Sequence, residues 1–399
     1  MSGFMQDSLA VSLLRFFLGL PRGVVALSAL GALSESLFCT ALAPQLPALD
    51  RALGLSHELS GFLVAGYSLG YWLGVIPAYQ FLAWKSARVV AFLAMCCIAF
   101  ASILFAIGFD FWLLFLARVL AGFGSVVIYA AVLGAAEAAV GSADRGAAIG
   151  TVYAGAAAGS AFGPVVGSLA IPFGRPTLFV ALAVVQIAVG LLLAAMPARD
   201  VVPQLNLARL RRCLKDGMVW IGLWVSSFPG FAIGVLTVSG SYQLDLLGAE
   251  PWLIASAFSG IALLDLGLSP LIGQMSDRIG RHFPLLIAFG AASFALLLIV
   301  LVQLKLTTAV LIAVVGALLL AVGGPGLAMV GDRVERRGGD VGEATLLMNF
   351  FYGPTAALGA ISAGLVHGAH GAESSFLILN AITFVSLILM ARILKSAQL

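Results

Sequence analysis

Three charged residues lie well inside apolar runs that are long enough to cross a membrane, and these side chains could do chemistry there. Glu35 lies twelve residues after Gly23, the predicted start of its run, which places it ~18 Å into the bilayer. Arg118 lies ~10 Å from the opposite edge of its own run, and therefore at a similar depth in a core of ~30 Å. A charge at that depth is costly, so it marks a proton relay, an ion pathway or a substrate contact. For Asp265 three explanations stay open: it is protonated, faces water or meets a cationic substrate.

The composition is that of an integral membrane protein. Of the 399 residues, 61% are hydrophobic and 10% charged, whereas about a quarter of a soluble domain is charged. The sequence contains nothing that resembles a catalytic triad, a phosphate-binding Gly-Lys-Ser/Thr loop or a nucleic-acid surface, so we expect no enzyme, ATP-driven pump or nucleic-acid partner. The four cysteines show no metal or disulfide spacing. Four histidines are expected in loops, without a metal: His57, His282, His367 and His370.

Twelve apolar runs of about 20 residues predict an all-α protein with twelve transmembrane helices. The runs are 23–46, 59–82, 88–108, 111–136, 147–171, 177–197, 218–243, 252–275, 284–304, 308–331, 342–366 and 375–394. Of the 21 Lys and Arg residues, seventeen lie on the side that holds both termini, three lie opposite, and one lies within a run. Because basic loops stay in the cytoplasm, we expect both termini there, in a cell (inner) membrane.

The same pattern divides the chain into four parts. Residues 1–22 form a cytoplasmic tail with a candidate interfacial helix, and 23–197 form a first six-helix half. Residues 198–217 form a basic cytoplasmic linker, and 218–399 form a second six-helix half.

The loop from Gly273 to Arg281 reads Gly-Gln-Met-Ser-Asp-Arg-Ile-Gly-Arg. It resembles the Gly-x-x-x-Asp-Arg-x-Gly-Arg signature of the major facilitator superfamily of transporters, whose two parallel six-helix halves enclose a midplane cavity. The equivalent first-half loop has lost this signature and carries Ala83 and Trp84 instead. The resemblance implies a conformational latch at Gly273, Asp277, Arg278, Gly280 and Arg281. We expect Arg278 or Arg281 to pair with Glu137 at the inner end of span four.

Two further motifs are similar to signatures within this superfamily. Span four contains Arg118-x-x-x-Gly122-x-Gly124, which resembles proton-coupled members. Span five resembles drug and metabolite antiporters through a stripe of small residues and a proline: Gly155, Gly159, Gly163, Pro164 and Gly167. Such a stripe lets a neighbouring helix approach closely, so we expect a helix-packing surface.

The resemblance also implies where the site lies. Spans one and four line the central cavity of this fold, so Glu35 and Arg118 are expected to face each other. Glu35 would then exchange its ion pair for a proton as the cavity opens and closes; the alternative is a static buried ion pair. Further residues expected along the substrate cavity are Asp265, Trp224, Phe228, Asn349 and Tyr352. For the aromatic residues of span seven, lipid contact or simple packing is the alternative.

The function implied by the resemblance is secondary transport by alternating access. We expect proton-coupled export of a small amphipathic or cationic organic compound by a monomer in a lipid bilayer, without a cofactor beyond the proton gradient. One alternative is proton-coupled uptake of a metabolite or siderophore-like anion, with Arg118 as the anion contact. Another is a sensor or assembly factor that keeps the fold without transport. The residue pattern does not name the substrate, because periodicity does not fix side-chain directions.

Overall fold

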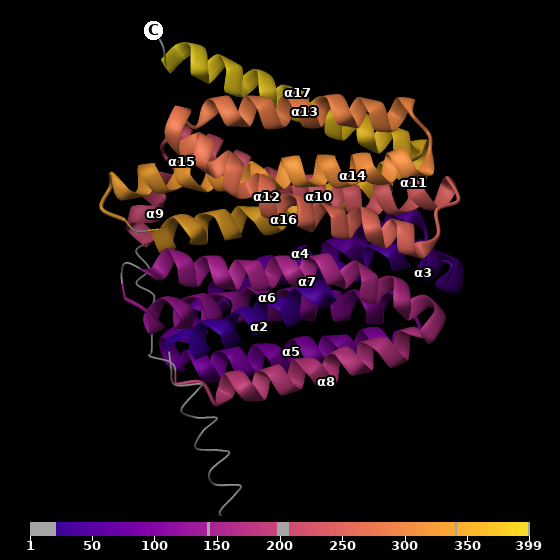
Figure 1. Ribbon diagram of the computed structural model, residues 1–399, viewed down its shortest axis with the longest axis horizontal. Coiled ribbons are helices and arrows are strands. Elements are labelled where there is room, and N and C mark those ends of the chain that lie inside the picture. The colour runs from indigo at the N-terminus through magenta and orange to yellow at the C-terminus, as the bar shows by residue number, and fades with distance from the viewer. Residues whose placement is uncertain (1–20, 142–143, 198–206, 340, 398–399) are drawn as a thin grey trace, which may run out of the picture.

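Each predicted apolar run forms a helical span in the computed structural model, which describes residues 21–141, 144–197, 207–339 and 341–397 (Figure 1). In these residues twelve spans are long and apolar enough to cross a membrane, and no strand occurs. The first half holds α2 (Pro21–Thr40), η1 (Ala43–Gln45), α3 (Leu46–Leu53), α4 (His57–Trp84), α5 (Ala87–Ile107), α6 (Phe111–Ala139), α7 (Arg145–Phe173) and α8 (Arg175–Ala194). After the short α9 (Leu207–Cys213), the second half holds α10 (Gly217–Val235), η3 (Leu236–Gly240), α11 (Ser241–Leu246), α12 (Pro251–Ile279), α13 (His282–Leu301), α14 (Lys305–Ala321), α15 (Gly323–Glu335), α16 (Val341–His370) and α17 (Ala372–Ala397).

Three spans are interrupted, and two of the interruptions have a visible cause. In span one, Pro44 and Pro47 occupy the first turns of η1 and α3, where a residue without a backbone N–H is tolerated. In span ten, α14 gives way to α15 at Val322, just before the Gly-Gly-Pro-Gly sequence. Span seven contains a π-helical turn, η3, a feature that often occurs at functional sites.

The helices pack in the same order in both halves of the molecule. Within the first half α2 packs on α7, α4 on α6, and α5 on α8; within the second half α10 packs on α16, α12 on α14, and α13 on α17. The halves meet through α4 against α16 and α7 against α12, and Figure 1 shows the first half below the second. This correspondence is what a duplicated six-helix unit produces. The predicted bounds of the tail and linker remain predictions, because 1–20 and 198–206 lie outside the described residues.

Glycines allow the first and fifth helices of each half to touch. A Cβ atom at Gly159 of α7 would lie 2.3 Å from the carbonyl oxygen of Leu33 in α2. A Cβ atom at Gly359 of α16 would lie 2.1 Å from the carbonyl oxygen of Phe231 in α10. Real Cβ atoms essentially never come this close to backbone atoms, so only glycine permits either contact.

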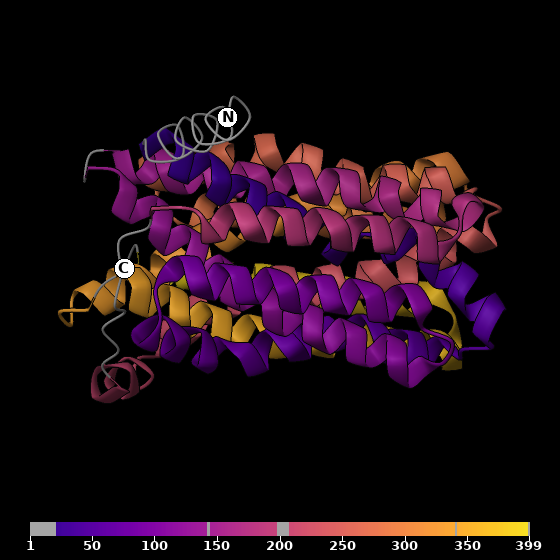
Figure 2. The same ribbon diagram turned by 90° about the horizontal axis from the view of Figure 1, so that it is seen from below.

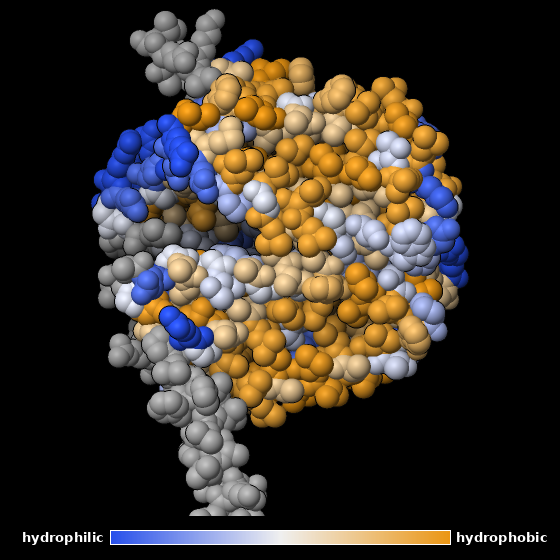
Figure 3. Space-filling model, viewed as in Figure 1, coloured by the Kyte–Doolittle hydropathy of each residue, from blue (hydrophilic) through white to orange (hydrophobic). Residues whose placement is uncertain are grey.

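The two ends of the bundle differ. The linker end, which carries α9 and the C-terminal part of α17, lies at the left in Figures 1 and 2. The distal end, which carries α3 and α11, lies at the right in Figure 1. Figure 3 shows a hollow between the halves at the linker end, bordered by hydrophilic residues, while most of the remaining visible face is hydrophobic. At the distal end the halves are in contact, as when Ser259 of α12 donates to the carbonyl of Ala161 in α7 at 2.6 Å.

Candidate substrate and proton site

Glu35 is buried in the C-terminal third of α2, with 3% of its surface exposed. Its Oε1 atom accepts a short hydrogen bond from the hydroxyl of Tyr67 in α4. Its Oε2 atom accepts one from the neighbouring Ser36 hydroxyl at 3.1 Å. The Ser36 hydroxyl is also hydrogen-bonded to Tyr129 of α6 at 3.0 Å, and in that bond either oxygen can donate. The carboxyl group therefore ends a chain of hydroxyl groups that joins three helices.

The predicted ion pair between Glu35 and Arg118 is not formed in this structure. The guanidinium of Arg118 lies 4.9 Å from the centre of the Tyr67 ring and donates to the carbonyl of Cys39 at 3.2 Å. It also lies 5.8 Å from the Phe38 ring, and only 4% of the residue is exposed. Tyr67 thus bridges the two groups, with its hydroxyl on the carboxyl and its ring face against the cation, an attractive arrangement.

Close contact between α4 and α6 fixes the position of Tyr67. A Cβ atom at Gly122 would lie 1.8 Å from the carbonyl oxygen of Tyr67, and one at Gly70 would lie 1.9 Å from that of Val119. Gly122, one helical turn after Arg118, therefore lets the Tyr67 backbone approach α6. As a result, the Tyr67 hydroxyl also reaches Ser125, 2.7 Å away.

Tyrosines extend the site toward the other half. The rings of Tyr71 in α4 and Tyr352 in α16 meet edge-to-face with centroids 6.4 Å apart, so they bridge the two halves. Tyr352 was predicted from the sequence, whereas the roles of Tyr67 and Tyr129 were missed. A signal was present: Tyr67 and Tyr71 are four residues apart, hence on one face of a helix, at mid-membrane depth.

Asp265 and Asn349 occupy the second half. Asp265 lies in the middle of α12, is partly exposed, and accepts a hydrogen bond from Ser269 at 2.6 Å. Asn349 is also partly exposed and lies one helical turn before Gly353, whose Cα faces Trp72 and Ser68 of α4. By register Asn349 therefore points toward the first half.

Trp224 and Phe228 do not line the space between the halves, contrary to the sequence-based expectation. Phe228 is fully buried and contacts Phe289 of α13, with ring centroids 5.5 Å apart. The Trp224 N–H group donates to Ser386 of α17 at 3.0 Å, beside a cavity of about 420 Å³ that residues of α17 line. Helical periodicity predicted a shared face correctly, but that face packs inside the second half.

Arg281 of the latch does not form the expected ion pair. Arg281 donates to Asp332 of α15 and, at 3.1 Å, to Asp277, so its partners lie in its own half. Glu137 is instead close enough to Arg145 of α7 to interact with it electrostatically. The predicted pairing of Arg278 or Arg281 with Glu137 is therefore wrong for Arg281 in this conformation, in which the linker end is hollow.

Of the two latch glycines, only Gly280 holds a backbone conformation that favours glycine. Gly280 has a φ of 91°, which favours glycine, at the turn between α12 and α13. Gly273 has open space where a Cβ atom would project.

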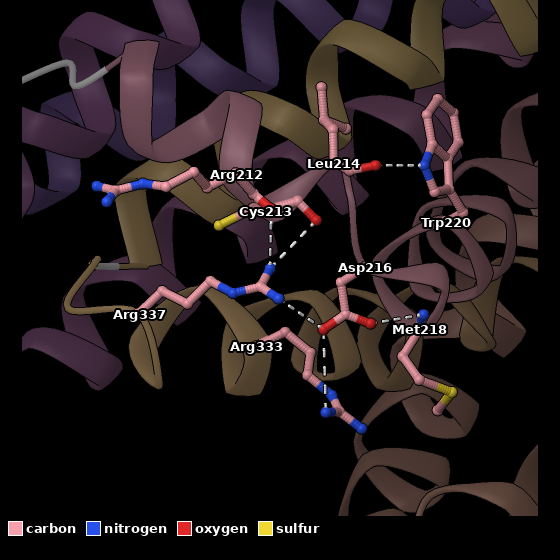
Figure 4. Close-up of polar contacts among 8 residues, drawn as sticks. All are labelled: Arg212, Cys213, Leu214, Asp216, Met218, Trp220, Arg333 and Arg337. Atoms are coloured by element: carbon pink, nitrogen blue, oxygen red, sulfur yellow. Dashed lines mark hydrogen bonds and ion pairs between the residues drawn. The ribbon is translucent and has the colours of Figure 1, made fainter.

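A cluster around Asp216 attaches the linker helix to the second half (Figure 4). Asp216 caps α10 by accepting from the N–H of Met218 at 2.9 Å, and it pairs with Arg337 at 3.2 Å and Arg333 at 4.0 Å. Arg337 also donates to the carbonyls of Arg212 and Cys213, which end α9. The cluster joins α9, α10 and the C-terminal end of α15.

Two repeated six-helix halves that meet around buried charged side chains define a membrane transporter that works between two conformations. The sequence matches the Major Facilitator Superfamily over residues 28–352. The chain belongs to this family and is a multi-pass transporter rather than an enzyme.

Solved structures share the fold. A bacterial homolog of the human lysosomal transporter Spinster, in an inward-facing and unoccupied conformation, aligns with a TM-score of 0.71 over 95% of this chain and 96% of its own, at 14% identity. The nucleoside transporter NupG aligns with a TM-score of 0.73 over 92% and 99%, also at 14% identity. A D-xylose–proton symporter aligns with a TM-score of 0.73 over 92% and 96%, at 14% identity. No curated protein matches the sequence.

Proposed function

We propose that this transporter couples the export of a small amphipathic or cationic organic compound to proton entry, with Glu35 as the proton carrier. The observation that carries the proposal is the hydroxyl chain at Glu35. A buried carboxylate is costly unless it is compensated by hydrogen bonds or a nearby cation. Glu35 has both, since Tyr67 and Ser36 donate to it and Arg118 lies across the Tyr67 ring.

The hydroxyl chain can accept a proton without rearrangement of heavy atoms. When Glu35 is ionised, Tyr129 donates to Ser36 and Ser36 donates to the carboxylate. When Glu35 is protonated on Oε2, each of these hydrogen bonds reverses its direction, and Tyr129 becomes the acceptor at the end. In both patterns each oxygen of the chain keeps a hydrogen bond within it, and the Ser36–Tyr129 bond permits either donor. Tyr129 is partly exposed, so the chain leads away from the buried carboxyl group.

The charges favour a cationic substrate over an anion. The charge of Arg118 is partly compensated by the Cys39 carbonyl and the Tyr67 ring, while its Nε atom has no hydrogen-bond partner in the structure. Glu35 and Asp265 are acidic, and the Tyr71–Tyr352 pair offers ring faces that attract a cation. A cation that approaches Glu35 favours loss of its proton, which is the competition that antiport requires.

The conformation fits the proposed direction. We propose that the linker end faces the cytoplasm, because most Lys and Arg residues lie there. The structure then represents a state open to the cytoplasm and closed outside, ready to load substrate.

Purified protein in liposomes with an imposed pH gradient tests the proposal. Addition of a transported compound should dissipate the gradient, and a panel of cationic, neutral and anionic compounds should show activity mainly among the cations. Activity confined to anions would support the uptake alternative instead, and binding without any transport would point to a sensor.

A further inference from the structure

The distal contact between the halves contains two stacked imidazole rings. His57, the first residue of α4, and His367 of α16 have ring centroids 4.4 Å apart and an interplanar angle of 19°. Neither lies in a loop, contrary to the sequence-based expectation, and His282 and His370 also belong to helices. His367 is 6% exposed, and its Nδ1 atom has no hydrogen-bond partner in the structure. A titratable pair that bridges the halves, with one ring buried and one partly exposed, is not used by the central site.

The groups around this pair all belong to the contact that closes the distal end. The Tyr242 ring of α11 lies 4.5 Å from His57, and its hydroxyl donates to Ser60 at 2.7 Å. A Cβ atom at Gly61 would lie 2.7 Å from the carbonyl oxygen of Ala360, so α4 and α16 are in direct backbone contact here. Separation of the two imidazoles therefore requires the halves to separate at this end.

The charged groups nearby determine how the pair takes up protons. The acidic residues are Asp50 of α3, Glu58 of α4 and Asp245 of α11, and Arg51 neutralises Asp245 at 3.0 Å. Asp50 interacts electrostatically with His57. Burial of the His367 ring disfavours its charged form, and a proton on both rings would also place two cations 4.4 Å apart. Double protonation should therefore be about ten-fold or more weaker in the stacked state. His370 of α16 is exposed and outside the stack.

We propose that His57 and His367 form a second proton site, which opens the distal end when both rings are protonated. The stacked state is compatible with at most one cation, so acid shifts the population toward the separated state. With the distal end outside, external acid would open the transporter to the side from which coupled protons enter. This site is separate from Glu35, and its behaviour does not depend on any substrate.

The distance between spin labels at Ala52→Cys of α3 and Ala369→Cys of α16 tests this proposal. Both positions are exposed and lie in different halves at the distal end. The background lacks the four native cysteines and carries Glu35→Gln, so that the central carboxyl cannot titrate. Between about pH 8 and about pH 5, the range in which histidine titrates, the separated population should rise about ten-fold.

Substitutions test whether the acid-induced rise of the separated population arises from His57 and His367. His367→Gln should abolish the rise, and His57→Gln should reduce it, because burial still opposes a proton on His367. His370→Gln should retain the rise in full. Tyr242→Phe, which loses the hydrogen bond to Ser60, should raise the separated population at every pH and keep its dependence on pH. A rise that survives in both His57→Gln and His367→Gln would overturn the proposal, and so would a distance that is independent of pH in the parent protein.

Discussion

The two hydroxyl groups that donate to Glu35 have different surroundings and therefore different roles. Tyr67 is held between the carboxyl group, Ser125 and the Arg118 guanidinium, so its direction is fixed. Ser36 has only Glu35 and Tyr129 as side-chain partners, and it can turn its proton toward either. We infer that Tyr67 positions the carboxyl group and that Ser36 passes the proton.

Tyr129→Phe should slow proton exchange by about a hundred-fold, the lower end of a general acid–base contribution. The substitution removes the terminal hydroxyl and leaves the ring and its packing in place. The measurement is the rate of substrate-driven pH change in liposomes. Tyr153→Phe is the control, because that half-exposed tyrosine of α7 is outside the chain of hydroxyl groups, and it should be unaffected. Equal rates in Tyr129→Phe and the parent protein would exclude the relay.

At this scale the sequence predicted part of the site. Glu35 and Arg118 stood out because charges are rare at mid-membrane depth. Their separation by Tyr67 could not be predicted, since it depends on the approach of α4 to α6 at Gly122. Trp224 and Phe228 were misassigned for a related reason: periodicity shows that residues share a face but not which helix that face meets.

The elements of the first half are held by contacts that tolerate no side chain. Gly159→Ala should destabilise the protein by about 1–3 kcal/mol, the usual cost of overpacking. Its new Cβ atom would meet the Leu33 carbonyl and the Ser36 side chain, so proton coupling should decline as well. Thermal unfolding in detergent and transport in liposomes measure the two effects.

Gly150→Ala is a matched control for this experiment. Gly150 lies on the same helix, but nothing lies within 4 Å of its Cβ position. A loss of stability in Gly150→Ala that equals that in Gly159→Ala would indicate a general intolerance of α7 to alanine, rather than contact with α2.

Asp216 caps the start of α10 and pairs with two arginines at the end of α15. These two roles are separable. Asp216→Ala should lose about 1 kcal/mol from the cap of α10, plus up to about 1 kcal/mol from its ion pairs with Arg333 and Arg337. Asp216→Asn should retain most of the cap, because asparagine also accepts from the Met218 N–H. Thermal unfolding distinguishes the two, with the exposed Arg336→Ala as control. Identical melting temperatures for all of these variants would contradict the assigned roles.

At the scale of the whole molecule, general physical rules that apply to any membrane protein were sufficient to predict the fold. Apolar length predicted twelve helices, and these are confirmed in the described residues. The family resemblance at the Gly273–Arg281 loop is confirmed over residues 28–352. The contacts between halves, such as His57 with His367, could not be predicted, because residues so distant in sequence are brought together only by the packing of two units.

The orientation in the membrane is a prediction at this scale. Cysteine labels at Arg211 and Glu335, both exposed at the linker end, should react only with reagents on the cytoplasmic side. Labels at Ala52 and Ala369 should react only from outside. The nearby turn residues Gly54 and Gly371 are avoided, because a cysteine would be strained at their positive φ values. One position that reacts from the opposite side would refute the proposed orientation.

Proton release on substrate binding tests the central claim most directly. When a transported cation binds to the protein in weakly buffered detergent near the midpoint of its pH dependence, we predict release of up to one proton per bound substrate. Glu35→Gln should bind the compound without releasing that proton, because the amide cannot ionise. Asp265→Asn should change the affinities for different compounds and keep the release. Release that persists in Glu35→Gln, or disappears only in Asp265→Asn, would contradict the assignment of Glu35 as the proton carrier.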